Sequence, residues 1–183
     1  MYFDDGVLET WLKGDRDAVE FIGIISDIAH VWDDLIDRDH PVDDETIDRV
    51  FSNMLIDLPR NAFYVKHFDR LHAILTTAIA NWQAANKMER EGDDYERSIA
   101  FILRSSYVDL VTQSAYLLGG AAWARQVAEE IRLMTHRETY GGYLEALDRE
   151  RARREKGGAA RSALPEGAVL VAPREKKHPV KPS

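Results

Sequence analysis

The spacing of apolar residues between Asp15 and Asp39 is the strongest constraint on the fold. Apolar side chains recur there every three or four positions, the period of an amphipathic α-helix. They are Ala18, Phe21, Ile22, Ile25, Ile28, Ala29, Trp32, Leu35 and Ile36. Asp15 is placed to cap this helix, and Pro41 follows its end. The apolar arc covers roughly half of the circumference, so we expect a central helix that contacts at least two others.

The same period recurs along most of the chain and predicts an all-α fold, a compact bundle of five or six helices. Further helical patterns cover about 5–13, 43–58, 61–92, 93–119, 121–134 and 143–156. The longest alternation of period two is 168–171, so we expect no sheet. All four tryptophans occupy apolar helical positions and are assigned to the core: Trp11, Trp32, Trp82 and Trp123.

Composition divides the 183 residues into a body and a tail. We assign residues 1–156 to one helical bundle domain and residues 157–183 to an extended C-terminal arm. Gly157 and Gly158 are expected to end the last helix, and four prolines beyond them disfavour regular structure. The chain has no cysteine, which excludes disulfides and thiolate sites, and no apolar stretch long enough to span a membrane.

The net charge changes sign close to this boundary, at about residue 148. Residues 1–148 carry 14 Lys and Arg against 28 Asp and Glu, a net charge of −14. Residues 149–183 carry 10 against 4, a net charge of +6. An acidic body argues against direct nucleic-acid binding by that part. The basic tail leaves several partners open: phosphate, nucleic acid, an acidic protein, a neighbouring copy, or solvent alone. The apolar segment 168–172 is the expected anchor of a docked arm.

Asp33, Asp34 and Asp37 form the most specific chemical pattern in the chain. Asp33 and Asp37 lie four residues apart and therefore on one side of a helix, where two carboxylates can hold a divalent cation. Two interpretations remain open. The carboxylates are a metal site, or they are neutralised by solvent and by basic side chains such as Arg38 and Arg49. Negative charge near a helix C-terminus is unfavourable unless a cation compensates it.

The segment 30–37, with Asp33-Asp34-x-x-Asp37, resembles the first aspartate-rich motif of class I isoprenoid (terpenoid) synthases. Those proteins are all-α, and the motif holds Mg²⁺ against a substrate diphosphate. The resemblance therefore implies Mg²⁺ as a cofactor and Asp33, Asp34 and Asp37 as its ligands. A second acidic motif is expected on a facing helix, and Asp109 is its best-placed candidate. The chain is shorter than such enzymes, and Asp109 has no carboxylate neighbour.

A broader resemblance covers most of the body. The segments 11–15, 32–42 and 101–120 are similar to a small, uncharacterised all-α protein family of tailed bacteriophages. This similarity implies a phage context and supplies no mechanism. The histidines add no second motif: none of the six forms an i,i+4 pair, and each is assigned to the surface or a helix edge. The polar residues from Arg104 to Ser114 suggest a buried hydrogen-bond network or a helix contact.

We therefore predict a non-enzymatic bacteriophage protein that acts through protein–protein contacts, as a structural component of the virion. Its expected partners are other phage structural proteins, or copies of itself bound through the arm, in the virion or the host cytoplasm. No membrane partner, catalytic residue or cofactor-binding residue is assigned. The alternative is a Mg²⁺-dependent enzyme of diphosphate chemistry with metal at Asp33, Asp34 and Asp37.

Overall fold

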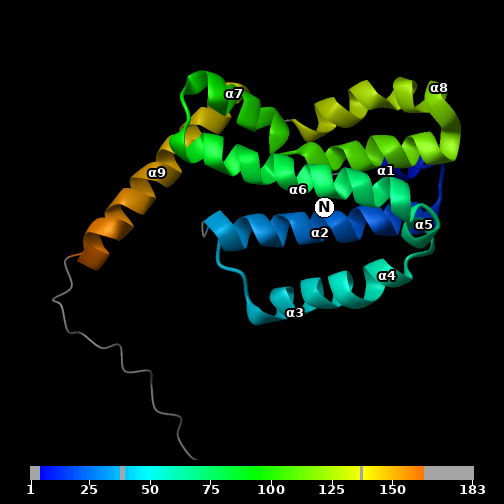
Figure 1. The fold of residues 1–183 in the computed structure, drawn as a ribbon, viewed down its shortest axis with the longest axis horizontal. Helices are drawn as coiled ribbons and strands as arrows, with labels where there is room; N and C mark the ends of the chain where they lie inside the picture. Colours follow the sequence, from blue (N-terminus) through cyan, green and yellow to red (C-terminus); the bar gives the residue numbers. More distant parts are fainter. Residues whose placement is uncertain (1–4, 38–39, 137, 163–183) are drawn as a thin grey trace, which may run out of the picture. The chain divides into compact units, whose positions relative to one another are not determined.

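The computed structural model describes residues 5–37, 40–136 and 138–162. Every regular element in these ranges is a helix, which confirms the predicted all-α class (Figure 1). The chain forms two compact units, Met1–Leu147 and Asp148–Ser183. The core and the cavity described below lie within the first unit. The arm predicted for residues 157–183 falls outside the described residues from position 163 onward.

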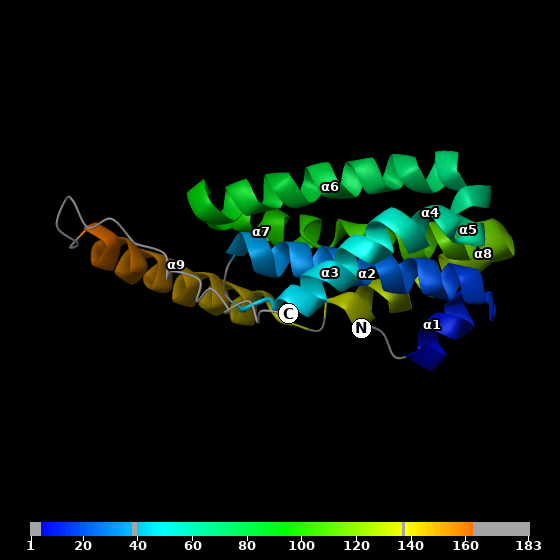
Figure 2. The ribbon, with the colours of Figure 1, turned by 90° about the horizontal axis from the view of Figure 1, so that it is seen from below.

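The helices follow one another through short connections. In chain order they are α1 (Asp5–Trp11), α2 (Arg16–Asp37), α3 (Asp44–Ser52), the π-helical turn η1 (Asn53–Asp57), α4 (Leu58–Arg60), α5 (Ala62–Lys66), α6 (Phe68–Glu91), α7 (Asp94–Leu103), the 3₁₀ turn η2 (Ser106–Val108), α8 (Asp109–Thr135) and α9 (Tyr140–Ser162). Helix α2 contacts α1, α3, α5 and α8, as its wide apolar arc predicts (Figures 1 and 2).

Side-chain caps set the helix boundaries close to the predicted positions. Asp15 Oδ1 accepts the backbone N–H of Ala18 at 2.9 Å, and so caps the start of α2. Asp43 caps α3 in the same way. Asp93 forms a capping box with Glu96, in which each side chain accepts the backbone N–H of the other residue. These caps satisfy backbone donors that have no partner inside the helix.

Helical structure continues past Pro59, where the sequence predicted an end. The π-helical turn η1 precedes the proline, and the N–H of Leu58 bonds to the carbonyl of Asn53, five residues back. Pro59 itself has no N–H, but it falls in the first turn of α4, where none is needed. The next cap, Asn61, accepts the N–H of Tyr64 and starts α5. A break at His67 then divides the predicted helix over 61–92 into α5 and α6.

Two further boundaries differ from expectation, and one agrees. The predicted helix over 93–119 is interrupted at Arg104 and Ser105, where the 3₁₀ turn η2 begins. The break predicted at Gly119–Gly120 is present: Gly120 has a φ of 75°, and the chain reverses there within α8 (Figure 1). Helix α9 runs through Gly157 and Gly158 to Ser162. Glycine lowers helix stability by only about 1 kcal/mol per residue, so these two glycines do not end it.

The core joins α1, α2, α5, α6 and α8. Its largest fully buried side chains include Leu8, Trp11, Phe21, Leu71, Leu110 and Ile131. Trp11 also ties α1 to α8, because its Nε1 donates to Glu130 at 2.9 Å and its carbonyl accepts from Trp123 Nε1 at 2.9 Å. Burial of this apolar surface, at about 25 cal/mol per Å², is the main stabilising contribution.

Several residues predicted to be core are not. Trp32, Trp82 and Trp123 are half-buried, and only Trp11 is fully buried. Leu35 and Ile36, in the last turn of α2, are each 43% exposed. Other apolar residues of the predicted helical stripes are also exposed: Phe51, Met54, Leu55, Phe68, Ile79 and Ile102.

The burial difference between the tryptophans predicts unequal effects of truncation. Trp11→Ala should lower the free energy of unfolding by about 3–5 kcal/mol, because it opens a cavity in the core. Trp32→Ala should lower it by about 1–2 kcal/mol, since its ring is only half-buried. Denaturant unfolding followed by circular dichroism measures both. Equal losses would contradict this assignment of the core.

Candidate functional site

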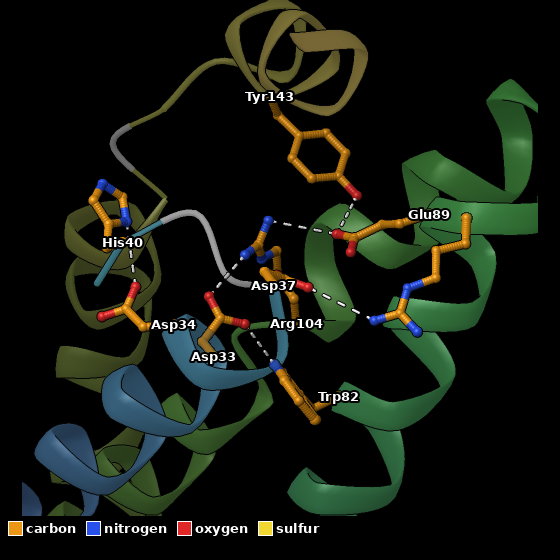
Figure 3. A network of polar contacts seen from close by, with 9 residues as sticks. Asp33, Asp34, Asp37, His40, Trp82, Glu89, Arg104 and Tyr143 are labelled. Carbon is orange, nitrogen blue, oxygen red and sulfur yellow. Dashed lines mark hydrogen bonds and ion pairs between the residues drawn. The ribbon is translucent and has the colours of Figure 1, made fainter. Parts of the chain in front are cut away.

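The acidic cluster of α2 lies at its C-terminal end, and its three carboxylates reach different partners (Figure 3). Asp33 Oδ2 lies 3.3 Å from Arg104, and its Oδ1 accepts Trp82 Nε1–H at 3.0 Å. Asp37 pairs with Arg90 at 3.7 Å. Asp34 lies 3.3 Å from the imidazole of His40. Basic side chains of other elements thus compensate the negative charge at this helix end.

The basic partners are not the ones that the sequence suggested. Arg49 pairs instead with Asp27, six residues before Asp33 on α2. Arg38 falls outside the described residues. The cations that approach Asp33 and Asp37 come from α6 and from the end of α7. Such long-range pairs leave no periodic signal in the sequence.

Arg104 links three parts of the bundle. Its guanidinium lies between Asp33 of α2 and Glu89 of α6, with the Glu89 oxygen at 3.5 Å. Glu89 in turn accepts the hydroxyl hydrogen of Tyr143, at 2.7 Å, from the first turn of α9 (Figure 3). Burial alone would lower the pKa of Arg104, but the carboxylates of Glu89 and Asp33 reverse this effect and raise it. Burial and the Glu89 contact raise the pKa of Tyr143, which therefore stays protonated.

Asp109, the candidate for a second acidic motif, does not face the first. Its carboxylate pairs with Arg132 within α8. The polar stretch from Arg104 to Ser114 does contribute buried groups: Ser105, Ser106 and Ser114 are buried, and Ser106 accepts from Asn81 at 3.1 Å. The sequence indicated a polar contact for Arg104, because this residue begins the polar stretch. It carried no signal for Glu89 or Tyr143.

A cavity of about 630 Å³ lies beside Asp33 and Arg104. Most of its wall is apolar or aromatic, contributed by Ile25, Ile28, Ala29, Trp32, Leu75, Ala78, Ile79, Trp82, Phe101 and Tyr107. Its polar groups are those of His30, Asp33, Arg104, Ser105, Thr135, His136 and Glu138. This size and this mixture, with a few polar groups on an apolar wall, are typical of small-molecule sites.

The two half-buried tryptophans of α2 and α6 form part of that wall. Their rings pack against each other with centroids 4.5 Å apart. The hydrogen bond from Trp82 to Asp33 holds one ring at the acidic end of the cavity. Their apolar helical positions were correctly recognised in the sequence, but the buried side of the helix here faces a cavity instead of a packed core.

Two histidines predicted at the surface or helix edges border the same cavity. His136 Nε2 lies 3.0 Å from the hydroxyl of Ser105, and burial, with a smaller contribution from Arg132, lowers the pKa of its imidazole. His30 Nδ1 is hydrogen-bonded to the backbone carbonyl of Ser26, one turn earlier. Ser105 and His136 can therefore hydrogen-bond a polar group of a bound molecule.

A second candidate surface lies on α3 and η1, which pack against α2 (Figure 1). We call it the α3–η1 face, and it consists of Phe51, Met54, Leu55 and Ile56. Phe51, Leu55 and Ile56 are each more than half exposed. Their spacing places Phe51, Met54 and Leu55 on one side of the helix. Contiguous apolar exposure of this kind marks interaction surfaces.

The chain matches no protein-family model, no curated protein and no solved structure. Among the described residues, no group of three or more His, Asp or Glu side chains is arranged to hold a metal ion. No helix in the described ranges has the length and hydropathy of a membrane span.

The contacts that join Arg104 to Asp33 and Glu89, which we call the Arg104 network, can be tested by substitution. Arg104→Met should lower the free energy of unfolding by about 1–3 kcal/mol, because Asp33 and Glu89 lose their shared cation. The arginine side chain is one-third exposed, so water reduces the effect below that of a fully buried pair. Adding Asp33→Asn to this variant should recover part of the lost stability, since it removes the repulsion between the carboxylates of Asp33 and Glu89. A double variant less stable than Arg104→Met would contradict the network.

Proposed function

We propose that this protein is a non-enzymatic structural component of a bacteriophage particle and acts through protein–protein contacts. The observation that carries the contact role is the α3–η1 face, which exposes four large apolar side chains on one short stretch of the chain. The phage context rests on the sequence resemblance of the body. The virion, or the host cytoplasm during assembly, is the corresponding location.

Charge favours one kind of partner for this face. Exposed carboxylates flank it at Asp48 and Asp57, and its nearest arginine, Arg49, is paired with Asp27. Two such faces would repel each other, so a symmetric contact is unfavourable. A basic segment with apolar residues is complementary. The arm, residues 157–183, has this composition, with five Lys and Arg against two Glu and a net charge of +3, and we propose that the arm of a neighbouring copy binds here.

Substitution of the face tests the proposal. Leu55→Asn combined with Ile56→Asn should weaken self-association by at least about tenfold, equivalent to 1.4 kcal/mol, because the change removes apolar contact area. Sedimentation equilibrium measures it. Leu133→Asn is the matched control, since Leu133 is also an exposed leucine but lies on α8. A parent chain that stays monomeric at high concentration, or equal effects of both variants, would count against the face as a self-contact.

The arm is tested separately by truncation. A chain of residues 1–162 keeps α9 and removes only the part that follows it. It should retain full helicity and lose self-association, and the association of the full chain should weaken with salt. Undiminished association of residues 1–162 would refute the arm. Loss of helicity would show instead that the segment stabilises its own body.

One observation favours the alternative function, a Mg²⁺-dependent enzyme of diphosphate chemistry: Asp33 borders an apolar, aromatic-lined cavity. In that reading Asp33 and Asp37 hold the metal, with Asp34 as a third ligand, and the cavity holds an apolar substrate. The metal would have to compete with Arg104 and Arg90 for these carboxylates.

Calorimetry separates the two functions. Mg²⁺ or Mn²⁺ at millimolar concentration, with and without inorganic diphosphate, should give no saturable binding, because basic side chains already compensate the carboxylates. Binding that disappears in Asp33→Asn/Asp37→Asn would instead support the enzyme. Glu129→Gln, an exposed carboxylate on α8, is the control for non-specific attraction of cations.

A further inference from the structure

The cavity beside Asp33 has a composition that selects its ligand by shape and by charge. Its wall combines the aromatic rings of Trp32, Trp82, Phe101 and Tyr107 with aliphatic side chains. Such a wall takes up the apolar body of an organic molecule through area burial and ring contacts. The volume of about 630 Å³ is within the range of small-molecule sites.

The charges around the cavity favour a cation. Asp33 and Glu138 line it, and Arg104 is the one arginine among the described lining residues; its guanidinium lies 3.5 Å from Glu89. Arg104 is shared between Asp33 and Glu89, so among the described residues here three carboxylates are set against one guanidinium. An anionic ligand would meet a net negative potential and would have to draw Arg104 away from both carboxylates.

The other basic groups that the structure describes nearby do not reverse this balance. Arg90 pairs with Asp37 and Arg132 pairs with Asp109. Burial lowers the pKa of His136, which keeps its imidazole uncharged near neutral pH. The described charges of the lining are therefore acidic on balance, although the Asp33 carboxylate is hydrogen-bonded.

We propose that this cavity binds an organic cation, an amine with an aromatic or aliphatic body. The ammonium group lies near Asp33, the body lies against Trp32 and Trp82, and Glu138 adds negative charge to the lining. A carboxylate has about four lone-pair sites, so Asp33 can accept from an ammonium group while keeping its bonds to Arg104 and Trp82. Indole faces add cation–π attraction, which is stronger where water is excluded.

A matched series of ligands tests charge separately from shape. Tryptamine, tryptophol and indole-3-acetate share one ring and differ in the charge of the side group. By isothermal titration calorimetry, tryptamine should bind at least about tenfold more tightly than tryptophol, and indole-3-acetate should bind most weakly. Equal affinities for the three ligands, or tightest binding of indole-3-acetate, would overturn the proposal. So would a dissociation constant of tryptamine above about 5 mM, which corresponds to a binding free energy of about −3 kcal/mol.

Variants locate the site. Glu138→Gln changes an exposed side chain of the lining, so it should leave the fold intact and reduce the preference for tryptamine about threefold or more. Glu129→Gln, on α8 and outside the lining, should change nothing. Ala29→Leu narrows the cavity and should weaken the binding of all three ligands by similar factors. If the circular dichroism spectrum of this variant shows misfolding, Ala78→Val is the replacement. Unchanged tryptamine binding in both Glu138→Gln and the folded narrowing variant would place the ligand elsewhere and refute the site.

Discussion

The packing of the body depends on the burial of the wide apolar arc of α2. No single neighbour can bury that arc, so α1, α3, α5 and α8 all lie against it (Figure 1). The first half of α2 is sealed into the core around Phe21 and Ile22. Its last turns carry Asp33, Asp34 and Asp37, where the helix dipole already contributes negative charge. Cations from α6 and α7 are what allow this end to lie inside the bundle.

The helix break at Arg104 and Ser105 positions that compensation. An uninterrupted helix from 93 to 119 would continue the path of α7, whereas the 3₁₀ turn η2 redirects the chain and starts α8. Arg104 lies at this break and reaches both Asp33 and Glu89, and Tyr143 completes the chain of contacts from α9 (Figure 3). Small residues on the neighbouring wall, including Ala29 and Ala78, leave the cavity open beside the network.

The two candidate surfaces are distinct and compatible. The cavity is lined by α2, α6, the ends of α7 and α8 and the residues that follow each, and the α3–η1 face consists of exposed residues on α3 and η1. A ligand in the cavity would stabilise the folded body by mass action. A contact through the α3–η1 face would join bodies together. Each property is accessible to measurement without the other.

The sequence by itself determined the helical class, the central α2, its cap at Asp15 and the helix break at Gly119–Gly120, because periodicity, capping and glycine conformation are local properties. It also located the acidic cluster. Only the tertiary structure decided that Arg104 and Arg90 approach that cluster, that Trp32 borders a cavity, and that Phe51 and Leu55 are exposed. These outcomes depend on which distant segment covers each helix face. A helical period states that a face is apolar, but the packing of other helices determines whether that face meets a core, a cavity or solvent.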